Sequence, residues 1–456
     1  MKKNTSFICV FFIFFAGILQ GYNWPVKVFT KQHGINATLG EWRDGPPIHF
    51  HAGVDINAPC STKVYTIEGG DTCYKDLVPS PRGINIGHFR YYHMVIRDTI
   101  QDSSFIASDS FFAKTDVGNH VHLQEGDVIL EHPGNPGNVH WLNPLRNGAI
   151  TPYADYTNPH IDSIKFYRQG GSAQLNADSL NGKVDIVAVA GDTRTDSTGH
   201  SAGHNVSVYR IGYLVKNMQD SIVKPYWEKV KFDSIPSNSY FSLVYAEGSS
   251  ETHFRYYVTN DVFNPDPGLK NMYWNTRQKI GEPDSINADS IEEAKYPDGE
   301  YKVIIKAFDI AYGIKENCKT RTINANIANF RPKVKYTDPY NGQNNVDLNK
   351  KVHITFSEDM NKRVDLNSAI SISPGVSGNF EWINDNEIEF TPEPAFVEST
   401  TYTITLSDQL KDLQNQKLIP YTFSFTTGLN NAYHVYPTTF QWENIDSWDI
   451  STNWSQ

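Results

Sequence analysis

Short apolar runs that alternate with turn-forming residues constrain the fold of this chain more than any other feature of its sequence. Over residues 22–152 these runs are separated by Gly, Pro and Asn at short intervals, and long helical periodicity is absent. This pattern is typical of antiparallel strands. The 25 Tyr and 25 Phe residues also favour strands. We therefore predict an all-β protein: a small antiparallel β-sheet domain followed by two Ig-like β-sandwiches.

The 456 residues are too many for one ordinary domain, and length alone suggests about three. Strand-like runs continue beyond residue 152, joined by polar loops, as in an Ig-like sandwich. Residues 259–295 fit that pattern poorly, and we expect an insertion there with some helix near 289–294. The predicted segments are a signal peptide (1–21), a compact β domain (22–152), a first sandwich (155–330), a second sandwich (332–428) and a C-terminal segment of unassigned role (429–456).

The N-terminus has the pattern of a secretory signal peptide. Lys2 and Lys3 precede the uncharged apolar run Phe7–Leu19, which is short for a membrane span. An uncleaved N-terminal anchor is the alternative. We expect the mature protein to be secreted, periplasmic or on the cell surface. Export also favours a disulfide between Cys60 and Cys73, with Cys318 left as a buried thiol.

The stretch Pro47–Pro59 carries the first residues suited to chemistry. His51 and Asp55 stand four apart, and in an extended strand even spacing puts both side chains on one face. An imidazole and a carboxylate are two of the three protein ligands that a catalytic zinc site needs. Two further motifs follow: an aromatic run that ends in His93, and the pair His120 and His122, which would share a strand face.

Taken together, these motifs resemble the lysostaphin-like (LytM-type) zinc endopeptidases that cut bacterial cell-wall peptides. The resemblance covers residues 38–152 and rests on Thr38–Arg43, His49–Asp55, Ile56–Tyr65, Tyr91–Met94, His120–Leu123 and Asn143–Leu145. It implies that His51, Asp55 and His122 hold Zn²⁺ and that His93 and His120 are the unliganded, catalytic histidines. The chain departs from that family at Asp116–Asn119, at Gly83–Gly87 and at Gln124–Glu125, which puts substrate preference in doubt more than metal binding.

A second resemblance covers residues 332–428, which are similar to the bacterial Ig-like modules of exported proteins. The matching residues are Asp338–Gly342, Val352–Met360, Phe390–Pro392, Thr401–Thr403 and Phe423–Thr427. The resemblance implies a spacer or an adhesive module without chemistry of its own.

The predicted function is that of a secreted zinc metalloendopeptidase that hydrolyses peptidoglycan peptides with a zinc-activated water. Such an ion lowers the pKa of its water to about 7, and we assign oxyanion stabilisation and proton transfer to His120 and His93. The same chemistry on another extracellular peptide is also open. The alternative is a catalytically silent adhesion or scaffold protein that binds cell wall or a partner. The Ig-like domains could bind a surface glycan or protein, whereas the net charge of −11 argues against nucleic acid and anionic membranes.

Several other residues have two possible roles. His49 would lie on the face of His51 in a regular strand and could compete for the metal, although the spacing to Asp55 favours His51. His88 and His140 fit surface or supporting positions. Asp192 and Asp196 could chelate calcium, but without a calcium-loop signature we expect solvated turn residues. Stacking on sugars and ordinary packing are both open to Trp442, Trp448 and Trp454.

Overall fold

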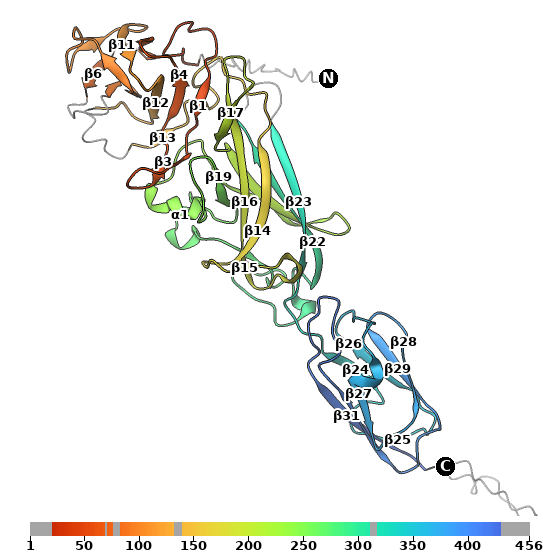
Figure 1. The fold of residues 1–456 in the computed structure, drawn as a ribbon. Helices are drawn as coiled ribbons and strands as arrows, with labels where there is room; N and C mark the ends of the chain where they lie inside the picture. The colour runs from red at the N-terminus through yellow and green to blue at the C-terminus, as the bar shows by residue number, and fades with distance from the viewer. Residues whose placement is uncertain (1–20, 69–70, 76–82, 132–138, 311–316, 430–456) are drawn as a thin grey trace, which may run out of the picture. The chain divides into compact units, whose positions relative to one another are not determined.

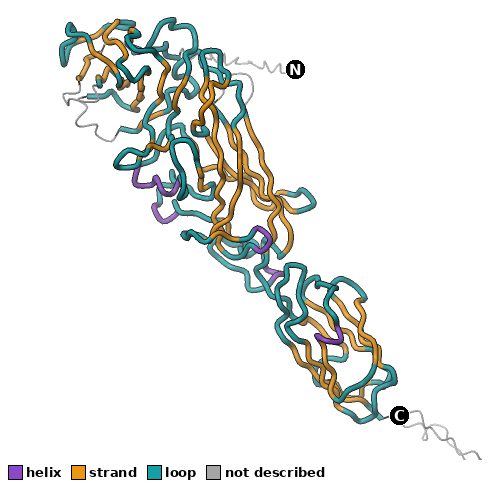
Figure 2. The backbone as a smooth tube through the Cα atoms, viewed as in Figure 1, coloured by secondary structure: helices purple, strands orange, loops and turns teal. Residues whose placement is uncertain are grey.

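The computed structural model describes residues 21–68, 71–75, 83–131, 139–310 and 317–429 (Figures 1 and 2). It divides into two compact units, residues 1–329 and 330–456. Strands make up almost all of its regular structure, so the all-β prediction is confirmed. Among the described residues, no helix combines the length and apolar character that crossing a membrane requires. The predicted signal peptide, apart from Gly21, and the three C-terminal tryptophans lie outside the described residues.

The N-terminal part of the first unit consists of short strands that pair antiparallel, as the turn-rich sequence predicts. Six of them follow one another across a sheet in the order β6-β7-β8-β12-β4-β1, and β5, β11 and β9 form a small separate sheet. The strands are β1 (Ile35–Ala37), β2 (Trp42–Arg43), β3 (His49–Phe50), β4 (Val54–Asn57), β5 (Lys63–Tyr65), β6 (Asp71–Lys75), β7 (Ile84–Ile86), β8 (Phe89–Tyr92), β9 (Met94–Ile96), β10 (Phe105–Ile106), β11 (Phe111–Thr115), β12 (His120–Gly126) and β13 (Trp141–Leu142).

Longer strands follow and form a two-layer sandwich. One layer is built on β16 and β14, and the other has the order β19-β18-β22-β23. Apolar residues of both layers form one buried core, which includes Ile186 and Ala188 of β16. The elements are β14 (His160–Arg168), β15 (Gln174–Leu175), η1 (Ala177–Ser179), β16 (Lys183–Thr195), β17 (Ser201–Val206), β18 (Arg210–Asn217), β19 (Ile222–Lys231), η2 (Asn238–Tyr240), α1 (Phe241–Val244), β20 (Arg255–Tyr257), η3 (Pro267–Leu269), β21 (Trp274–Asn275), η4 (Ile291–Glu293), β22 (Gly299–Phe308) and β23 (Cys318–Ile327).

The two predicted N-terminal domains share a sheet. Strand β1 pairs with β4 on one side and with β16 on the other, through Ile35 and Thr195. This ladder joins the short strands to the sandwich in one compact unit that ends at residue 329. Asn143 adds a second link, because its side-chain amide donates to the carbonyl of Phe232. Short apolar runs in the sequence identify such strands but do not reveal which distant strand each one joins.

The second unit is a smaller sandwich of two four-stranded sheets, in the orders β24-β26-β29-β28 and β25-β31-β30-β27. Alternating apolar residues from both sheets fill its core, among them Ile354, Phe390 and Phe425. The elements are β24 (Val334–Asp338), β25 (Gln343–Val346), β26 (Val352–Phe356), α2 (Leu366–Ala369), β27 (Ile370–Ser373), β28 (Gly378–Trp382), β29 (Glu387–Pro392), β30 (Thr401–Leu406) and β31 (Tyr421–Thr427).

Three local expectations need correction. Cys60 and Cys73 are both free, one exposed and one buried in the core, because Cys73 belongs to β6 and its thiol faces the 101–104 turn instead. Cys318 is half-buried rather than buried. The helix expected near 289–294 is the single 3-10 turn η4.

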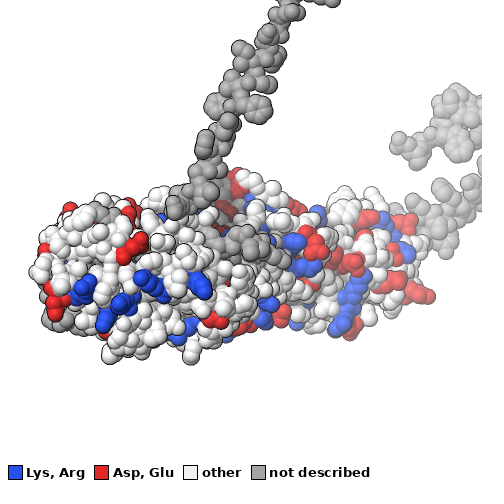
Figure 3. Space-filling view, turned by 90° about the horizontal axis from the view of Figure 1, so that it is seen from above, with Lys and Arg blue, Asp and Glu red and all other residues white. Residues whose placement is uncertain are grey.

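On the face drawn in Figure 3, acidic and basic side chains are interspersed.

Candidate metal centre

A pair of adjacent strands brings two of the predicted ligands together. In the ladder between β4 and β12, Asp55 lies directly opposite His122. Directly opposed residues of an antiparallel pair have neighbouring Cβ atoms and side chains on the same face. Strand β8 flanks β12 on its other edge, with Tyr92 opposite His122. Strand β12 therefore holds His122 between Asp55 of β4 and Tyr92 of β8.

His51 also lies beside Asp55 and His122, but it is not part of the extended strand that the sequence suggests. It lies in a bend between β3 and β4 rather than in a strand that continues to Asp55. The close approach of Gly53 to β12 explains the bend, because a Cβ atom on Gly53 would stand 2.2 Å from the carbonyl oxygen of Leu123. The expectation of one regular strand was wrong, but the convergence of His51 and Asp55 was right.

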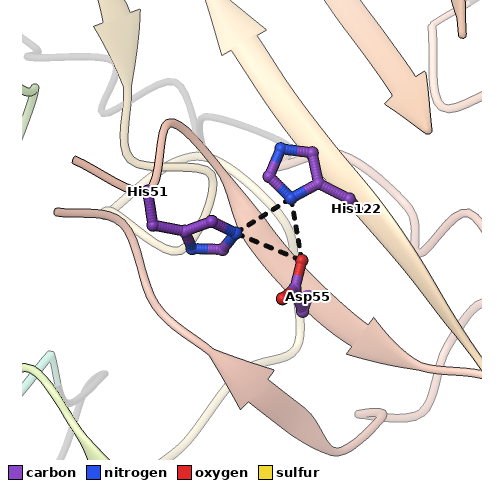
Figure 4. A group of neighbouring side chains, drawn as sticks. All are labelled: His51, Asp55 and His122. Carbon is purple, nitrogen blue, oxygen red and sulfur yellow. Dashed lines mark hydrogen bonds and ion pairs between the residues drawn. The ribbon is translucent and has the colours of Figure 1, made fainter. Parts of the chain in front are cut away.

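The three side chains meet at one point, as Figure 4 shows. His51 Nε2 lies 2.9 Å from His122 Nδ1 and 3.2 Å from Asp55 Oδ1, and His122 Nδ1 lies 2.8 Å from Asp55 Oδ1. Ligand atoms around a tetrahedral zinc ion, with bonds of roughly 2.0–2.1 Å, stand about 3.3 Å apart. The donor set of two imidazole nitrogens and one carboxylate oxygen, at this spacing, fits a zinc ion with one position left open.

Hydrogen bonds on the far side of each imidazole orient the two rings. His51 Nδ1 lies 2.8 Å from the carbonyl oxygen of Thr38, so it carries the proton and leaves the lone pair of Nε2 facing Asp55 and His122. His122 Nε2 lies 3.1 Å from the side-chain amide of Gln124, whose oxygen is buried and has no hydrogen-bond partner. A rotation of the Gln124 amide by 180° exchanges its nitrogen and oxygen. In that orientation the oxygen accepts a hydrogen bond from His122 Nε2, and His122 Nδ1 is free to bind a metal.

An ion pair between half-buried Arg43 and buried Glu41 stands beside the Asp55 carboxylate. Arg43 donates to Glu41 at 2.8 Å, and its second terminal nitrogen lies 3.6 Å from Asp55 Oδ2. Glu41 in turn accepts from the backbone and hydroxyl of Thr38. The predicted lead-in segment Thr38–Arg43 is therefore the support of the site, since it supplies both the carbonyl that orients His51 and the cation beside Asp55.

Burial and charge set the protonation of the ligands. Burial raises the pKa of Asp55, but when protons rather than a metal ion occupy the nitrogens that face it, interactions with His51 and then His122 outweigh burial and hold that pKa well below its usual value. Burial lowers the pKa of His122 to about 4, against a smaller opposing effect of Asp55. At neutral pH the carboxylate is ionised and His122 is neutral, which are the forms that bind a divalent metal.

The two remaining predicted histidines stand beside the ligands. The rings of His93 and His120 are 4.5 Å apart, and His93 lies 6.1 Å from His122. His120 Nδ1 donates to the carbonyl of Gly118 at 2.7 Å, and its Nε2 lies 3.7 Å from Asp55 Oδ1. Burial, followed by the charge of His120, lowers the pKa of His93. His93 has a backbone φ of 62°, a left-handed conformation uncommon for residues with a side chain.

The site opens into a cleft of about 280 Å³. Its wall includes Arg43, His49, Tyr92, His93 and Gln124 in addition to the three ligand candidates and Ala52. His49 lies at this wall but outside the ligand group, with Nδ1 bonded to the carbonyl of Pro47. His88 pairs with Glu68, and the exposed His140 pairs with Asp127. From the sequence, no role at the site was assigned to Arg43, which ends the segment Thr38–Arg43, or to Gln124, which was noted only as part of the departure Gln124–Glu125.

Comparison with known proteins bears on the second unit. Residues 328–427 match the family of bacterial Ig-like domains. This confirms the second resemblance. No curated protein matches the chain.

Similarities to solved structures are weak. An L,D-transpeptidase from Mycobacterium smegmatis is 20% identical over 22% of this chain and 41% of its own, with a TM-score of 0.18. The N-terminal part of the bacterial S-layer protein SbsC is 21% identical over 22% of this chain and 24% of its own, also at 0.18. Mouse protocadherin-24 EC1-3 covers 82% of this chain and 95% of its own at 10% identity and a TM-score of 0.19. TM-scores this low do not establish a shared fold.

Proposed function

We propose that this chain is an exported zinc-dependent endopeptidase that hydrolyses peptide bonds of bacterial cell wall. The observation that carries the proposal is the triangle of His51 Nε2, Asp55 Oδ1 and His122 Nδ1, with sides of 2.8–3.2 Å, at the base of a cleft. Two imidazoles and one carboxylate are the ligand chemistry of a catalytic rather than a structural zinc site.

His51, Asp55 and His122 would hold the ion. A bound zinc ion supplies a Lewis acid and lowers the pKa of water to about 7, which makes a nucleophile available at neutral pH. His120 Nδ1 donates to the Gly118 carbonyl, which leaves its Nε2, 3.7 Å from Asp55 Oδ1, able to accept or return a proton beside the ligands. His93 is half-buried beside it, and an N–H of its neutral ring can donate to the oxyanion that forms on the peptide carbonyl.

The substrate assignment depends on the resemblance of residues 38–152 to lysostaphin-like endopeptidases. The bacterial Ig-like domain at 328–427 fits an extracellular setting, and we propose that it serves as a spacer or an adhesive module next to the cell wall. A cleft lined by Tyr92, Arg43 and histidines is suited to a short peptide, because it offers one aromatic face and several hydrogen-bond donors.

The test uses the full chain loaded with one equivalent of zinc and incubated with purified cell-wall sacculi. We expect soluble peptide fragments, detected by mass spectrometry, that a chelator abolishes and added zinc restores. The masses identify the bond that is cut. A panel of unrelated extracellular peptides in parallel distinguishes wall-specific cleavage from a broader peptidase.

The matched variants are His122→Ala, which removes a ligand candidate, and His140→Ala, which removes an exposed histidine of the same unit paired only with Asp127 among described residues. We expect cleavage to be lost in the first and kept in the second. Binding to sacculi without cleavage by the zinc-loaded chain would contradict the proposal and favour a silent adhesion or scaffold protein.

A further inference from the structure

A second cluster of acidic side chains lies in the first unit, away from the histidines. Asp155, Asp192 and Asp309 are all buried, and one carboxylate oxygen from each lies within 4.8 Å of the others. Asp155 belongs to the connection between β13 and β14, Asp192 to β16, and Asp309 directly follows β22. Three separate parts of the chain therefore bring their carboxylates to one point.

None of the ion pairs among the described residues involves these three aspartates. A buried charge is stable only when it is paired, coordinated or neutralised. Only neutral groups donate to the carboxylates: Asp155 accepts from the backbone of Thr157 and the hydroxyl of Tyr153, Asp192 from the backbone of Thr193, and Asp309 from the backbone of Ile310 and the Asn317 amide. The carboxyl groups of Asp155 and Asp192 also each contact that of Asp309. Their charges thus lack an opposite charge among the described side chains.

A separate observation points to a missing ligand. Asp192 is only 2% exposed, and its Oδ2 is buried without any hydrogen-bond partner. Its other oxygen, Oδ1, already accepts from the Thr193 amide at 2.8 Å. One carboxylate oxygen of Asp192 lies within 4.8 Å of an oxygen of Asp155 and of an oxygen of Asp309, so its carboxyl group stands beside the other two. A buried carboxyl group with one unpartnered oxygen, next to two more carboxylates, is suited to binding a cation.

We propose that Asp155, Asp192 and Asp309 bind a calcium ion. All donors are oxygens, which hard cations prefer and which disfavour zinc and other transition metals that choose imidazole or thiolate. Magnesium sheds its water reluctantly and usually keeps several water ligands, whereas this cluster is buried. Calcium accepts carboxylates and carbonyl oxygens in flexible geometry.

The position of the cluster gives the ion a role. Asp155 lies in the connection that leads from the short-strand region to the sandwich, whereas Asp192 and Asp309 come from the two different layers of that sandwich. Nearby Tyr153 and Ile310 pack into the core of the short-strand region. A bound ion would therefore clamp the sandwich to the region that carries the histidine cluster. This inference is independent of the proposed peptidase activity.

The experiment measures thermal unfolding and calorimetric binding of the full chain after metals are removed by chelation. Calcium at about 100-fold above its Kd should raise Tm by about 5 °C, and calorimetry should give one site per chain. Asp192→Asn should abolish this shift. Asp185→Asn, which changes another buried carboxylate on the same strand β16, should keep it.

Two further measurements keep the test decisive. His122→Ala should show the full calcium shift, so that failure of the zinc proposal leaves the calcium result unaffected. If Asp192→Asn does not fold, terbium luminescence of the native chain replaces it. Tyr153 makes a side-chain hydrogen bond to Asp155 and is near enough to sensitise bound terbium, and calcium should displace the terbium and abolish the signal. Absence of calcium binding, an equal Tm response to magnesium, or a full calcium shift in folded Asp192→Asn would overturn the proposal.

Discussion

The histidine cluster (His51, Asp55 and His122) and the aspartate cluster (Asp155, Asp192 and Asp309) each bring three ionisable side chains to one point. All of these side chains are buried except the half-buried Asp55, yet the chemistry of the two clusters differs. In the first, Asp55 stands with two imidazoles, and Arg43 lies beside it. In the second, each of the three carboxylates has only carboxylates as ionisable ligand neighbours. Mixed nitrogen and oxygen donors suit zinc, and oxygens alone suit calcium. The surroundings of a carboxylate, rather than the carboxylate itself, decide which ion it serves.

The pKa values of the two clusters shift in opposite directions for this reason. Burial raises the pKa of every carboxylate in both, but only Asp55 has His51 and His122 to reverse the effect. Burial and the neighbouring Asp309 raise the pKa of Asp155 to about 8, and burial raises that of Asp309 to about 6. The histidine cluster is thus arranged for an ionised carboxylate before a metal arrives, whereas the aspartate cluster needs a cation or protons.

The largest effect that would break this comparison comes from removing one ligand of the histidine cluster. His122→Ala should lower peptide cleavage on the order of 10³-fold or more, because the loss of the ion removes several kcal/mol of transition-state stabilisation. Metal analysis should show no bound zinc, while calcium binding is unchanged. Loss of both metals from this variant would mean that the two clusters are not separate sites.

A smaller effect is expected when a histidine beside the ligands is removed. His120→Ala should lower kcat roughly 10²–10³-fold, because the proton-transfer group is lost, and should leave zinc stoichiometry at one. His120 makes its own bond to the Gly118 carbonyl and stands outside the three-atom ligand group. Kinetics with parallel metal analysis check this. Zinc loss in His120→Ala would show that His120, not His122, completes the ligand set.

A still smaller effect is expected from Gln124, which supports the ligand His122 without belonging to the ligand group. Gln124→Met removes the amide that bonds His122 Nε2 while keeping a side chain of similar length. Loss of such an orienting partner typically costs 10–100-fold in metal affinity. Competition with a chelator of known zinc affinity measures the change, and Gln124→Glu, which can still accept from His122, should retain most of the affinity. Equal affinities in Gln124→Met and the native chain would exclude an orienting role.

The sequence predicted the histidine cluster better than the aspartate cluster for a physical reason. His51, Asp55, His120 and His122 lie in short sequence motifs. The ladder between β4 and β12 pairs Asp55 with His122 directly, and His51 lies only four residues before Asp55. Asp155, Asp192 and Asp309 are each isolated in the sequence, and only long-range packing of β16, β22 and the connecting segment unites them. The expectation that Asp192 is a solvated turn residue was therefore wrong, because it lies inside β16.

Its neighbour Asp196 shows how close that expectation came. Asp196 does belong to a turn, where its carboxylate accepts from the backbone of Thr198 and His200. The strand ends at Thr195, one residue earlier. The boundary between the buried and the solvated aspartate thus lies where β16 stops pairing. At Thr195 the strand pairs with Ser201 of the adjacent β17 and also with Ile35 of β1, a contact between residues 160 positions apart in the chain. Composition and turn signals within the segment carry no information about that contact.

The last effect concerns stability rather than metal binding or catalysis, and it comes from Asp185, a buried carboxylate that belongs to neither cluster. Burial raises its pKa to about 6, although the Gly170 amide opposes the shift. The folded chain therefore keeps a proton between about pH 4 and 6 that the unfolded chain has released, and stability falls as pH rises through that window. Between pH 4 and pH 7 the free energy of unfolding should therefore fall less in Asp185→Asn than in the native chain. The difference between the two falls should be up to about 3 kcal/mol. Urea unfolding of the first unit in calcium-saturated buffer measures the difference, and parallel pH profiles would show that Asp185 is ionised throughout. Asp185 lies on the same strand as Asp192. If its substitution changes the pH dependence of stability but not the stabilisation by calcium, then calcium binding requires the three clustered carboxylates and not burial of a carboxylate alone.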